Sequence, residues 1–353
     1  LLITALALIF PEHTLRIFGC SDTLMALAKD YLFGYAPFLV FNGLLIASEF
    51  FVRLDGSPKF AMAASVVQQL GSATQVAMGF AQGSDALAAR MTGTAEPAFL
   101  VAGGSGMGFE ARARGAGAWR QQVGGWGVTG AVEAGEVFTP RDPLIAGAHD
   151  WRRFGYSRAS VALDRRIGTV VASVGVSRLA ERDTVLGAWF DTGLGAPKAA
   201  SWFLDTTARW RSEDGWTLGG SWRAGRTALS TRSGIRGGGL LASTAWAVDL
   251  GRDGVFGADS LGLRLAQPLR IGSGGLDLVL PTGWSYADAA VSAWTPQRLD
   301  LAPRGRELDV EARYGRPLAG GWLQANLFWR RDPGNVAALP ADQGAALRYS
   351  RGF

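Results

Sequence analysis

Few side chains in this sequence could carry catalytic or metal-binding chemistry. The chain of 353 residues has two histidines, His13 and His149, and one cysteine, Cys20. Neither histidine lies at metal-ligand spacing from other ligands, and one cysteine cannot form an internal disulfide. Asp150 follows His149, but no serine motif is present that this pair could activate. The sequence therefore predicts no catalytic residue, no metal site and no cofactor, and we expect that the protein is not an enzyme.

Positive charge is the next chemical feature of the chain, with a formal net charge of +5. Almost all of it is arginine, because only Lys29, Lys59 and Lys198 are lysines. The arginines are spread singly along alternating segments, without the basic run or basic helix that binds nucleic acid. Arginines that line the interior of a membrane barrel explain this pattern better. We therefore expect no nucleic-acid partner.

Amino-acid composition divides the chain into parts that differ from one another. All 13 tryptophans lie at or beyond Trp119, and all five methionines lie at or before Met107. We predict a membrane-like helical segment at residues 1–66, a linker with a possible pore helix at 67–118, and a strand array at 119–353. The candidate for the pore helix is residues 68–91, and the Gly/Ala/Arg-rich residues 102–117 are a flexible linker.

The first part is predicted to enter a membrane as helix. Residues 31–52 are nearly all apolar, and at 1.5 Å per residue they would span roughly 33 Å, enough for a bilayer. A buried helix of a soluble protein is the alternative reading. The sequence starts inside an apolar run without the basic region of a signal peptide, so we expect that it is an internal segment of a longer chain.

A charged loop follows this apolar stretch and carries a family resemblance. Its characteristic residues are Arg53, Asp55, Gly56, Pro58 and Lys59. An apolar helix that ends in Arg before Asp-Gly-x-Pro-Lys resembles the multidrug and toxic compound extrusion (MATE) family. The resemblance covers residues 1–66 and implies a drug/cation antiporter. A complete transporter of this kind has about a dozen helices, so these residues could be only a fragment of one.

The remaining chain alternates with the period of a β-strand. Residues 202–210 place Trp202 and Trp210 at the ends of one apolar face, with polar side chains on the other. Residues 213–215 predict a tight hairpin turn before the next such strand. Lipid outside and a hydrated interior fit these faces better than a soluble sandwich does, because the apolar face ends in aromatic residues. The predicted interface aromatics are Trp202, Trp210, Trp216, Trp222 and Trp329.

We therefore predict an all-β fold, an antiparallel outer-membrane β-barrel of about 12 strands, preceded by an α-helical membrane-like segment. Its terminal strand would present Leu347, Tyr349 and the final Phe353. This strand, with segments such as 214–223, 306–314 and 320–335, resembles the C-terminal translocator domain of autotransporters. It is similar in particular to that of the subtilisin-type (S8) serine peptidases of sphingomonad-like bacteria. The resemblance covers residues 70–353 and implies a helix in the pore.

The expected function is that of an outer-membrane translocator and anchor, with the protease passenger domain absent from this chain. Its partners would be the lipid bilayer and the barrel-assembly machinery. One alternative is a truncated MATE-type antiporter fragment with the barrel as an accidental tail. Another is a non-functional fusion, because a long apolar helix stops transfer across the inner membrane and would keep the chain there.

Overall fold

The computed structural model describes residues 11–17, 20–29, 64–92, 99, 109, 111–140, 151–189, 198–231 and 236–350. The chain divides into two compact units, Leu1–Ala64 and Ser65–Phe353. In the first unit the described elements include α2 (Pro11–Ile17) and the 3-10 helix η1 (Asp22–Leu24). Arg16 pairs with Asp22 at 2.9 Å there. Among the described residues, no helix combines the length and apolar character that a membrane crossing needs. The predicted helix at 31–52 lies outside the described residues.

The second unit is built on one sheet of 14 strands, in which every pair of known register is antiparallel. This confirms the predicted fold class. The first strands are β1 (Ala64–Gln69), β2 (Thr74–Phe80), β3 (Ala111–Val123), β4 (Trp126–Pro140), β5 (Trp151–Ile167) and β6 (Val170–Arg182). The later strands are β9 (Lys198–Arg211), β10 (Trp216–Ser230), β11 (Arg236–Asp253), β12 (Ser260–Ser285), β13 (Ala290–Asp300), β14 (Leu308–Leu318), β15 (Gly321–Arg331) and β16 (Asp342–Ser350).

Strands that follow one another in sequence are neighbours in the sheet, apart from small excursions. The order runs β1-β2-β3-β4-β5-β6-β9-β10-β11-β12-β14-β15-β16, with β13 paired to β12 alone. The pair β7 (Thr184–Val185) and β8 (Ala188–Trp189) forms a separate small hairpin. The count of 14 exceeds the 12 strands that we predicted. Two of the strands, β1 and β13, lie outside the continuous series from β2 to β16, so that series holds the predicted number.

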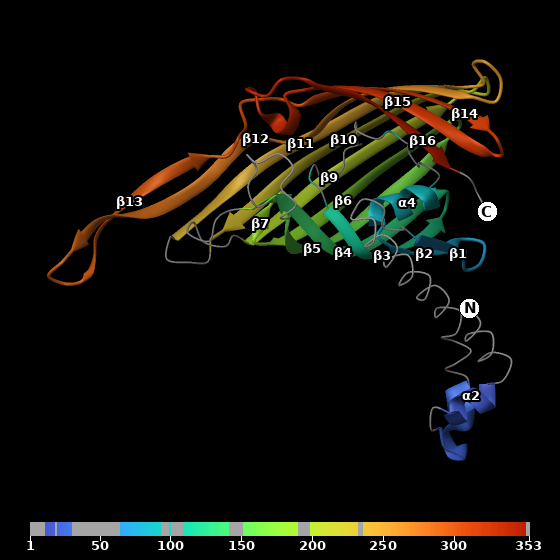
Figure 1. The fold of residues 1–353 in the computed structure, drawn as a ribbon, viewed down its shortest axis with the longest axis horizontal. Helices are drawn as coiled ribbons and strands as arrows, with labels where there is room; N and C mark the ends of the chain where they lie inside the picture. The colour runs from blue at the N-terminus through green and yellow to red at the C-terminus, as the bar shows by residue number, and fades with distance from the viewer. Residues whose placement is uncertain are drawn as a thin grey trace. The chain divides into compact units, whose positions relative to one another are not determined.

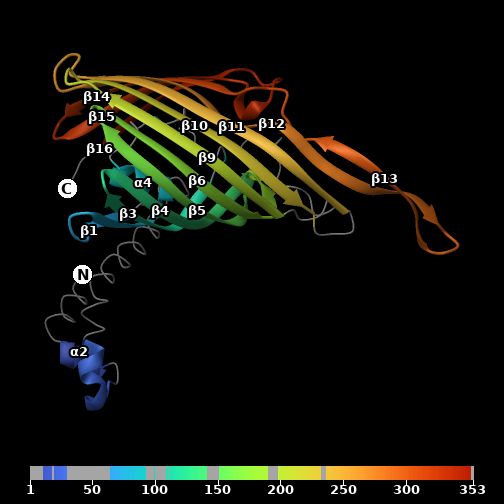
Figure 2. The same ribbon diagram turned by 180° about the vertical axis from the view of Figure 1, so that it is seen from behind.

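The sheet curves strongly along its width. In Figures 1 and 2 the strands β14–β16 lie on the opposite side of the molecule from β3–β5. Such curvature follows from the right-handed twist between neighbouring strands, accumulated over a long series. The strands at the two ends of the order, β1 and β16, have no pairing with each other among the described residues.

The connections between strands differ at the two ends of the sheet. At one end, which we call the short-turn rim, they are residues 70–73, 124–125, 168–169, 212–215, 254–259 and 319–320. The predicted tight turn at 213–215 is among them and is confirmed. At the other end, the long-connection rim, they are residues 81–110, 141–150, 183–197, 231–235 and 332–341, with the β12–β13 ribbon. Each of these short turns contains a glycine with positive φ, as with Gly124 at 56° and Gly215 at 84°.

One short turn is fixed by a carboxylate. Asp259 accepts hydrogen bonds from the backbone N–H of Phe256 at 2.9 and 3.2 Å. The hydrogen bond from Phe256 lowers the pKa of the Asp259 carboxyl below its ordinary value, because the N–H group stabilises the ionised form. The turn between β11 and β12 is therefore held in one conformation just before the long strand β12 begins.

The region between residues 67 and 118 differs from the prediction. Residues 64–69 and 74–80 are strands β1 and β2, and helix α4 covers only Ser84–Thr92. The strand array also begins before residue 119, since β3 starts at Ala111. Residues 111–118 are mostly alanine, glycine and arginine and show no large apolar alternation. Their pairing with β4 makes them a strand, which propensity alone does not reveal.

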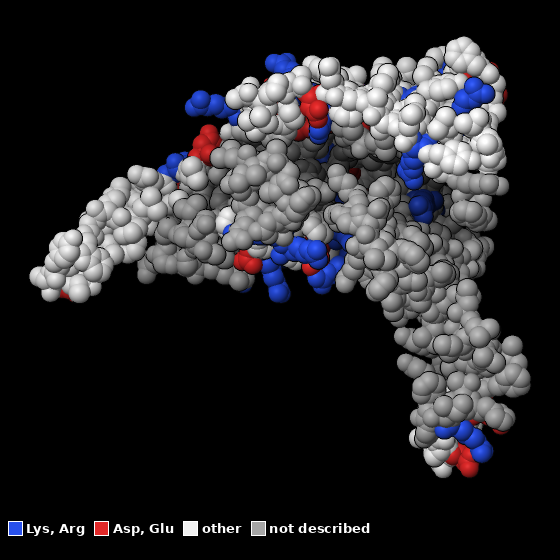
Figure 3. Space-filling model, in the orientation of Figure 1, with Lys and Arg blue, Asp and Glu red and all other residues white. Residues whose placement is uncertain are grey.

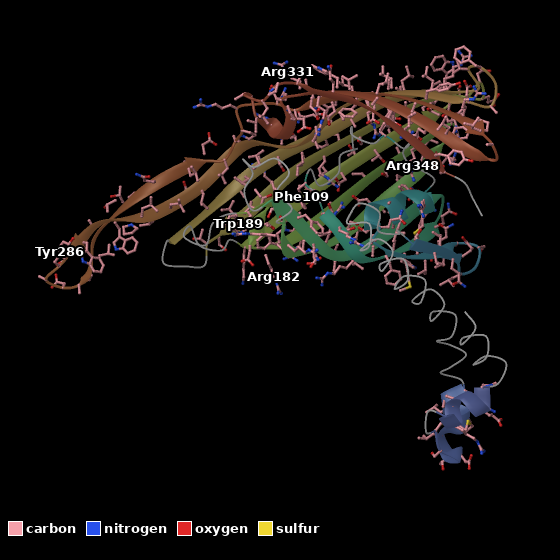
Figure 4. All side chains as sticks on the ribbon, viewed as in Figure 1. Phe109, Arg182, Trp189, Tyr286, Arg331 and Arg348 are labelled. Carbon is pink, nitrogen blue, oxygen red and sulfur yellow. The ribbon has the colours of Figure 1, made fainter. Side chains whose placement is uncertain are left out.

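Strand β12 continues past its neighbours and forms a two-stranded ribbon with β13. Residues 275–285 of β12 pair with 290–300 of β13, and Figure 1 shows the ribbon projecting from the long-connection rim. Tyr286 lies at the turn of this ribbon, and its side chain is 92% exposed (Figure 4). β12 is paired with β11 as far as Val279, and the ribbon leaves the sheet beyond this residue. Gly274, which has φ +111°, directly precedes the first residue of β12 that pairs with β13.

Replacing Gly274 should weaken the sheet where the pairing between β12 and β13 begins. A side chain at Gly274 would be strained by its φ, and its Cβ would lie 2.1 Å from the carbonyl oxygen of Leu240. We expect Gly274→Val to lower the free energy of unfolding by about 2 kcal/mol or more, measured by urea unfolding of the refolded full chain in detergent. Gly272→Val is the matched control, because its Cβ would have no atom nearer than 3.8 Å. Equal losses in both variants would contradict this account.

Candidate functional site

The distribution of side chains between the two faces of the sheet is the reverse of that in a soluble protein. Large apolar residues project outward, as with Trp202 at 55% exposure and Leu263 at 51%. Charged residues are enclosed, as with Arg223 and Asp249 at 3% and Glu311 at 0%. Both sets occur within the same strands, because successive residues of a strand point to opposite faces. The alternation predicted for residues 202–210 has this orientation.

Helix α4 is held against the inner face by charged and polar contacts. Asp85, in its first turn, pairs with Arg158 of β5 at 2.5 Å and lies 3.8 Å from Arg223 of β10. The backbone N–H of Ser84 donates to the carboxylate of Glu133 on β4. A carboxylate at this position satisfies one of the free N–H groups of the helix start. The helix is thus anchored at its N-terminal end to three different strands of the sheet.

The arginines that bind Asp85 share a second carboxylate. Asp205 of β9 pairs with Arg223 and lies 3.9 Å from Arg158. Ser177 of β6 also donates to Asp205 at 2.9 Å. Arg158 and Arg223 are each 4% exposed in their side chains, so removal from water is offset by partners on both sides. We call Asp85, Arg158, Asp205 and Arg223 the α4 ion-pair cluster.

Further polar networks extend the same inner face. Asp249 lies between Arg264 at 3.0 Å and Arg209 at 3.3 Å. Arg120 pairs with Asp164. On β14 and β15, Asn326 donates to Glu311 at 2.6 Å and Gln324 donates to Asn326 at 2.9 Å. Each of these buried carboxylates therefore has a cationic or amide partner, as buried charges require.

The interior is apolar nearer the long-connection rim. One cluster comprises Val137, Tyr156, Leu179, Phe203, Ala245 and Leu269, with Phe109 packed against it. Figure 4 shows Phe109 within the curve of the sheet. The β7–β8 hairpin is fixed beside this cluster by Glu181, which accepts from the backbone N–H groups of Leu186 and Gly187 at 2.8 Å and from Thr184 at 3.0 Å. The enclosed space thus has an ion-paired part and an apolar part.

A cavity of about 590 Å³ lies beside α4. Its lining includes side chains of the α4 ion-pair cluster together with Arg90, Asp164, Ser173, Thr207 and Arg209. Four arginines and three aspartates of this lining come from α4 and from several strands, so charges of both signs face the cavity. Among the described residues, no group of histidine, cysteine, aspartate and glutamate has the arrangement of a metal site. The geometry supplies charge pairing and positioning, which suits a hydrated interior.

The predicted interface aromatics are brought to the outer face. Trp202, Trp210, Trp216, Trp222 and Trp329 are each between 37% and 55% exposed. Trp210 and Trp216 lie near the short-turn rim, and Trp202 lies toward the other end of β9. Trp222 differs from the prediction, because it pairs with Thr206, midway between Trp202 and Trp210. Alternation assigns a residue to a face, but only strand register fixes its height on that face.

The structure describes only some of the remaining residues that we predicted to be functional. Leu347 and Tyr349 lie on β16 opposite Ala325 and Leu323. The Tyr349 hydroxyl donates to the carbonyl of Ala319 at 3.1 Å, which ties the last strand to a short turn. Phe353, His149 and the loop residues at 53–59 lie outside the described residues. Cys20 is described as a free cysteine.

Sequence reasoning missed the α4 ion-pair cluster. Arg158, Asp205 and Arg223 were available as inward positions of alternating strands, and this signal could have identified them as interior charges. Asp85 lies on a helix, so strand alternation could not identify it as an interior charge. Its sequence separation from Arg158 is 73 residues, so only the folded arrangement shows that they meet.

Comparison with known proteins gives one family match. Residues 1–74 match the model of the MatE family, which confirms the resemblance of the N-terminal part. Comparison with curated proteins gives no match. Among solved structures the chain is similar to "Copper transporter OprC", with 12% sequence identity and a TM-score of 0.26. The aligned region covers 82% of this chain and 57% of that one. At this TM-score the similarity carries no argument about fold or function.

Removing the shared carboxylate of the α4 ion-pair cluster should destabilise the protein. Asp205→Asn would leave Arg158 and Arg223 buried with only Asp85 between them, and breaking a buried pair costs about 3–5 kcal/mol. We expect a loss of this order in urea unfolding of the refolded full chain. Asp277→Asn is the control, since Asp277 and Arg298 are 67% and 68% exposed and 3.9 Å apart. A loss below about 1 kcal/mol for Asp205→Asn would show that the cluster is not stabilising.

Proposed function

We propose that the strand unit spans the bacterial outer membrane as a barrel and acts as the translocator and anchor of an autotransporter. The observation that carries this proposal is the reversed distribution of side chains. An apolar outer face is stable against lipid, and an ion-paired inner face is stable against water. The antiparallel strands also pair their backbone groups internally, which a bilayer requires.

The two rims support the outer membrane as the destination. Outer-membrane barrels have short turns on the periplasmic side and longer loops outside the cell. The short-turn rim and the long-connection rim of this sheet follow that division. On this assignment β16 ends at the periplasmic side, where its last residues, with Phe353, would be available to the barrel-assembly machinery.

The translocator role rests on the sequence resemblance together with the position of α4. A helix N-terminal to most of the strands, held against the inner face by the α4 ion-pair cluster, is what a translocator retains after its passenger has passed through. The passenger protease is absent from this chain, and we assign no catalytic role to any residue. The bilayer is the partner that the outer face requires.

The match of residues 1–74 to the MatE family favours a second candidate for the N-terminal unit. This unit is then a fragment of a drug/cation antiporter, joined to a barrel with which it shares no function. Alternating access needs a site between two helical repeats, which so short a segment does not supply. The expressed chain should therefore leave drug tolerance unchanged in an efflux-deficient strain. Glu49 is the single charged residue of the apolar stretch 31–52. Increased tolerance that is lost in a Glu49→Gln variant would support the antiporter instead.

Membrane insertion can be tested at the middle of the outer face. Val176 lies near the middle of β6 and is 47% exposed. Val176→Arg should lower stability in lipid by about 2–4 kcal/mol, and Ser230→Arg at the end of β10 by about 1 kcal/mol or less. The measurement is urea unfolding of the full chain refolded into vesicles, followed by its heat-modifiable gel shift. A water-soluble monomer without detergent, or equal effects of both substitutions, would exclude the membrane barrel.

A further inference from the structure

Charged residues are divided by sign between the two faces of five neighbouring strands. On β5, β6, β9, β10 and β11 the acidic residues described, such as Asp164, Asp205 and Asp249, occupy inward positions. The outward positions of these strands hold no described aspartate or glutamate. Their charged residues are all basic: Arg153, Arg165, Arg178, Arg182, Lys198, Arg226 and Arg252. The outer face of this region is therefore purely cationic wherever it is charged.

Most of these basic residues gather at the long-connection rim. Strand register places Arg178, Trp202 and Arg226 in one row across β6, β9 and β10. A second row, nearer the rim, holds Arg182, Lys198 and Ser230. With strands about 4.8 Å apart and about 3.3 Å per residue, the backbone positions of these cations lie roughly 5–16 Å from one another. We call Arg178, Arg182, Lys198 and Arg226 the rim basic patch.

The pictures agree with this placement. Figure 4 shows Arg182 projecting from the outside of the sheet, away from α4. Figure 3 shows blue Lys and Arg side chains, together with some red Asp and Glu side chains, along the lower part of this view. The four residues of the patch are exposed, and so is Trp202, which lies between Arg178 and Arg226.

Within the described part of the chain, no ion pair neutralises the rim basic patch. Glu136, an acidic residue on the outer face of β4, is already engaged by Arg114. Asp183 follows Arg182 in the loop, and no described ion pair joins it to the patch. The other rim is different, because Arg165 and Arg252 stand singly over Trp126 and Trp216 at 5.0 and 4.9 Å from the ring centroids.

We infer that the rim basic patch binds the phosphorylated headgroups of membrane lipids. This inference rests on the proposed function, which sets the patch at the end of a lipid-facing surface in the outer leaflet. Apolar side chains below it, such as Leu204 and Val176, would contact acyl chains, while Trp202 lies at the boundary. Guanidinium groups bind phosphate through paired N–H donors. A lipid phosphate is the partner that matches both the charge and the adjoining apolar surface.

Lipid binding by the refolded full chain tests the inference. Its affinity for diphosphorylated lipid A in a non-ionic detergent would be measured by native mass spectrometry. Phosphatidylcholine, whose zwitterionic headgroup has no net charge, is the reference. The double variant Arg178→Gln/Arg226→Gln should lose about tenfold or more in affinity, since each basic residue near an anionic surface contributes about 1 kcal/mol. The matched control is Arg165→Gln/Arg252→Gln, which removes the same charges at the other rim and should change affinity less than twofold.

The outcomes separate this inference from the proposed function. A heat-modifiable gel shift first shows whether each protein has folded as a barrel, and the single variants replace the double one if it fails to fold. A folded barrel that binds lipid A no better than phosphatidylcholine would contradict lipid binding by the rim basic patch, and so would equal losses of affinity in both double variants. Neither result would contradict the proposed barrel. Competition by millimolar inorganic phosphate alone would also overturn it, since the site would then recognise free phosphate.

Discussion

The pairing of buried arginines with buried carboxylates on the inner face is the interaction on which the other features of this structure depend. A sheet with an apolar outer face needs an interior of opposite character, and charged residues provide it only when they are neutralised in place. Asp205 and Asp249 each bind two arginines that come from other strands. Strands that are distant in sequence are thereby fixed at a common height, and the curvature of the sheet brings α4 within reach of the same charges.

The interior enclosed by the sheet has an apolar part and an ion-paired part. Phe203 and Asp205 are successive inward residues of β9, yet the first joins the apolar cluster and the second the α4 ion-pair cluster. The apolar cluster lies where the β7–β8 hairpin and Phe109 enter the enclosed space, so loop side chains fill the interior there. The ion-paired part borders a polar cavity instead. A hydrated space and a packed one thus follow from which side chains the loops bring inward.

The strand faces could be predicted from the sequence because their period is two and the side chains on each face are chemically uniform. Trp202 and Trp210 were assigned to the correct face for this reason. The prediction was wrong in regions that lack that signal. Residues 111–118 have small side chains. Residues 74–80 were predicted as helix, and their pairing with β3, which makes them a strand, is a long-range contact. The height of Trp222 and the contacts of Asp85 depend on register and on long-range contacts, which local pattern does not contain. The MATE-like loop was recognised from a short motif, independently of any fold.

The position of β1 follows from where the two parts of the chain join. The family match ends at residue 74, the first residue of β2, so β1 belongs to the matching segment. β1 pairs with the edge of β2 that faces away from β3. In a closed barrel built from the series β2 to β16, that edge is the one β16 would need. Both strands cannot use it, and β1 has the advantage of a short connection, in which the Leu70 N–H donates to the Thr74 carbonyl at 2.8 Å. In the described part of the chain, the second edge of β16 has no partner, and the position of β1 explains this. The series β2 to β16 itself has the even number of strands that is typical of bacterial outer-membrane barrels.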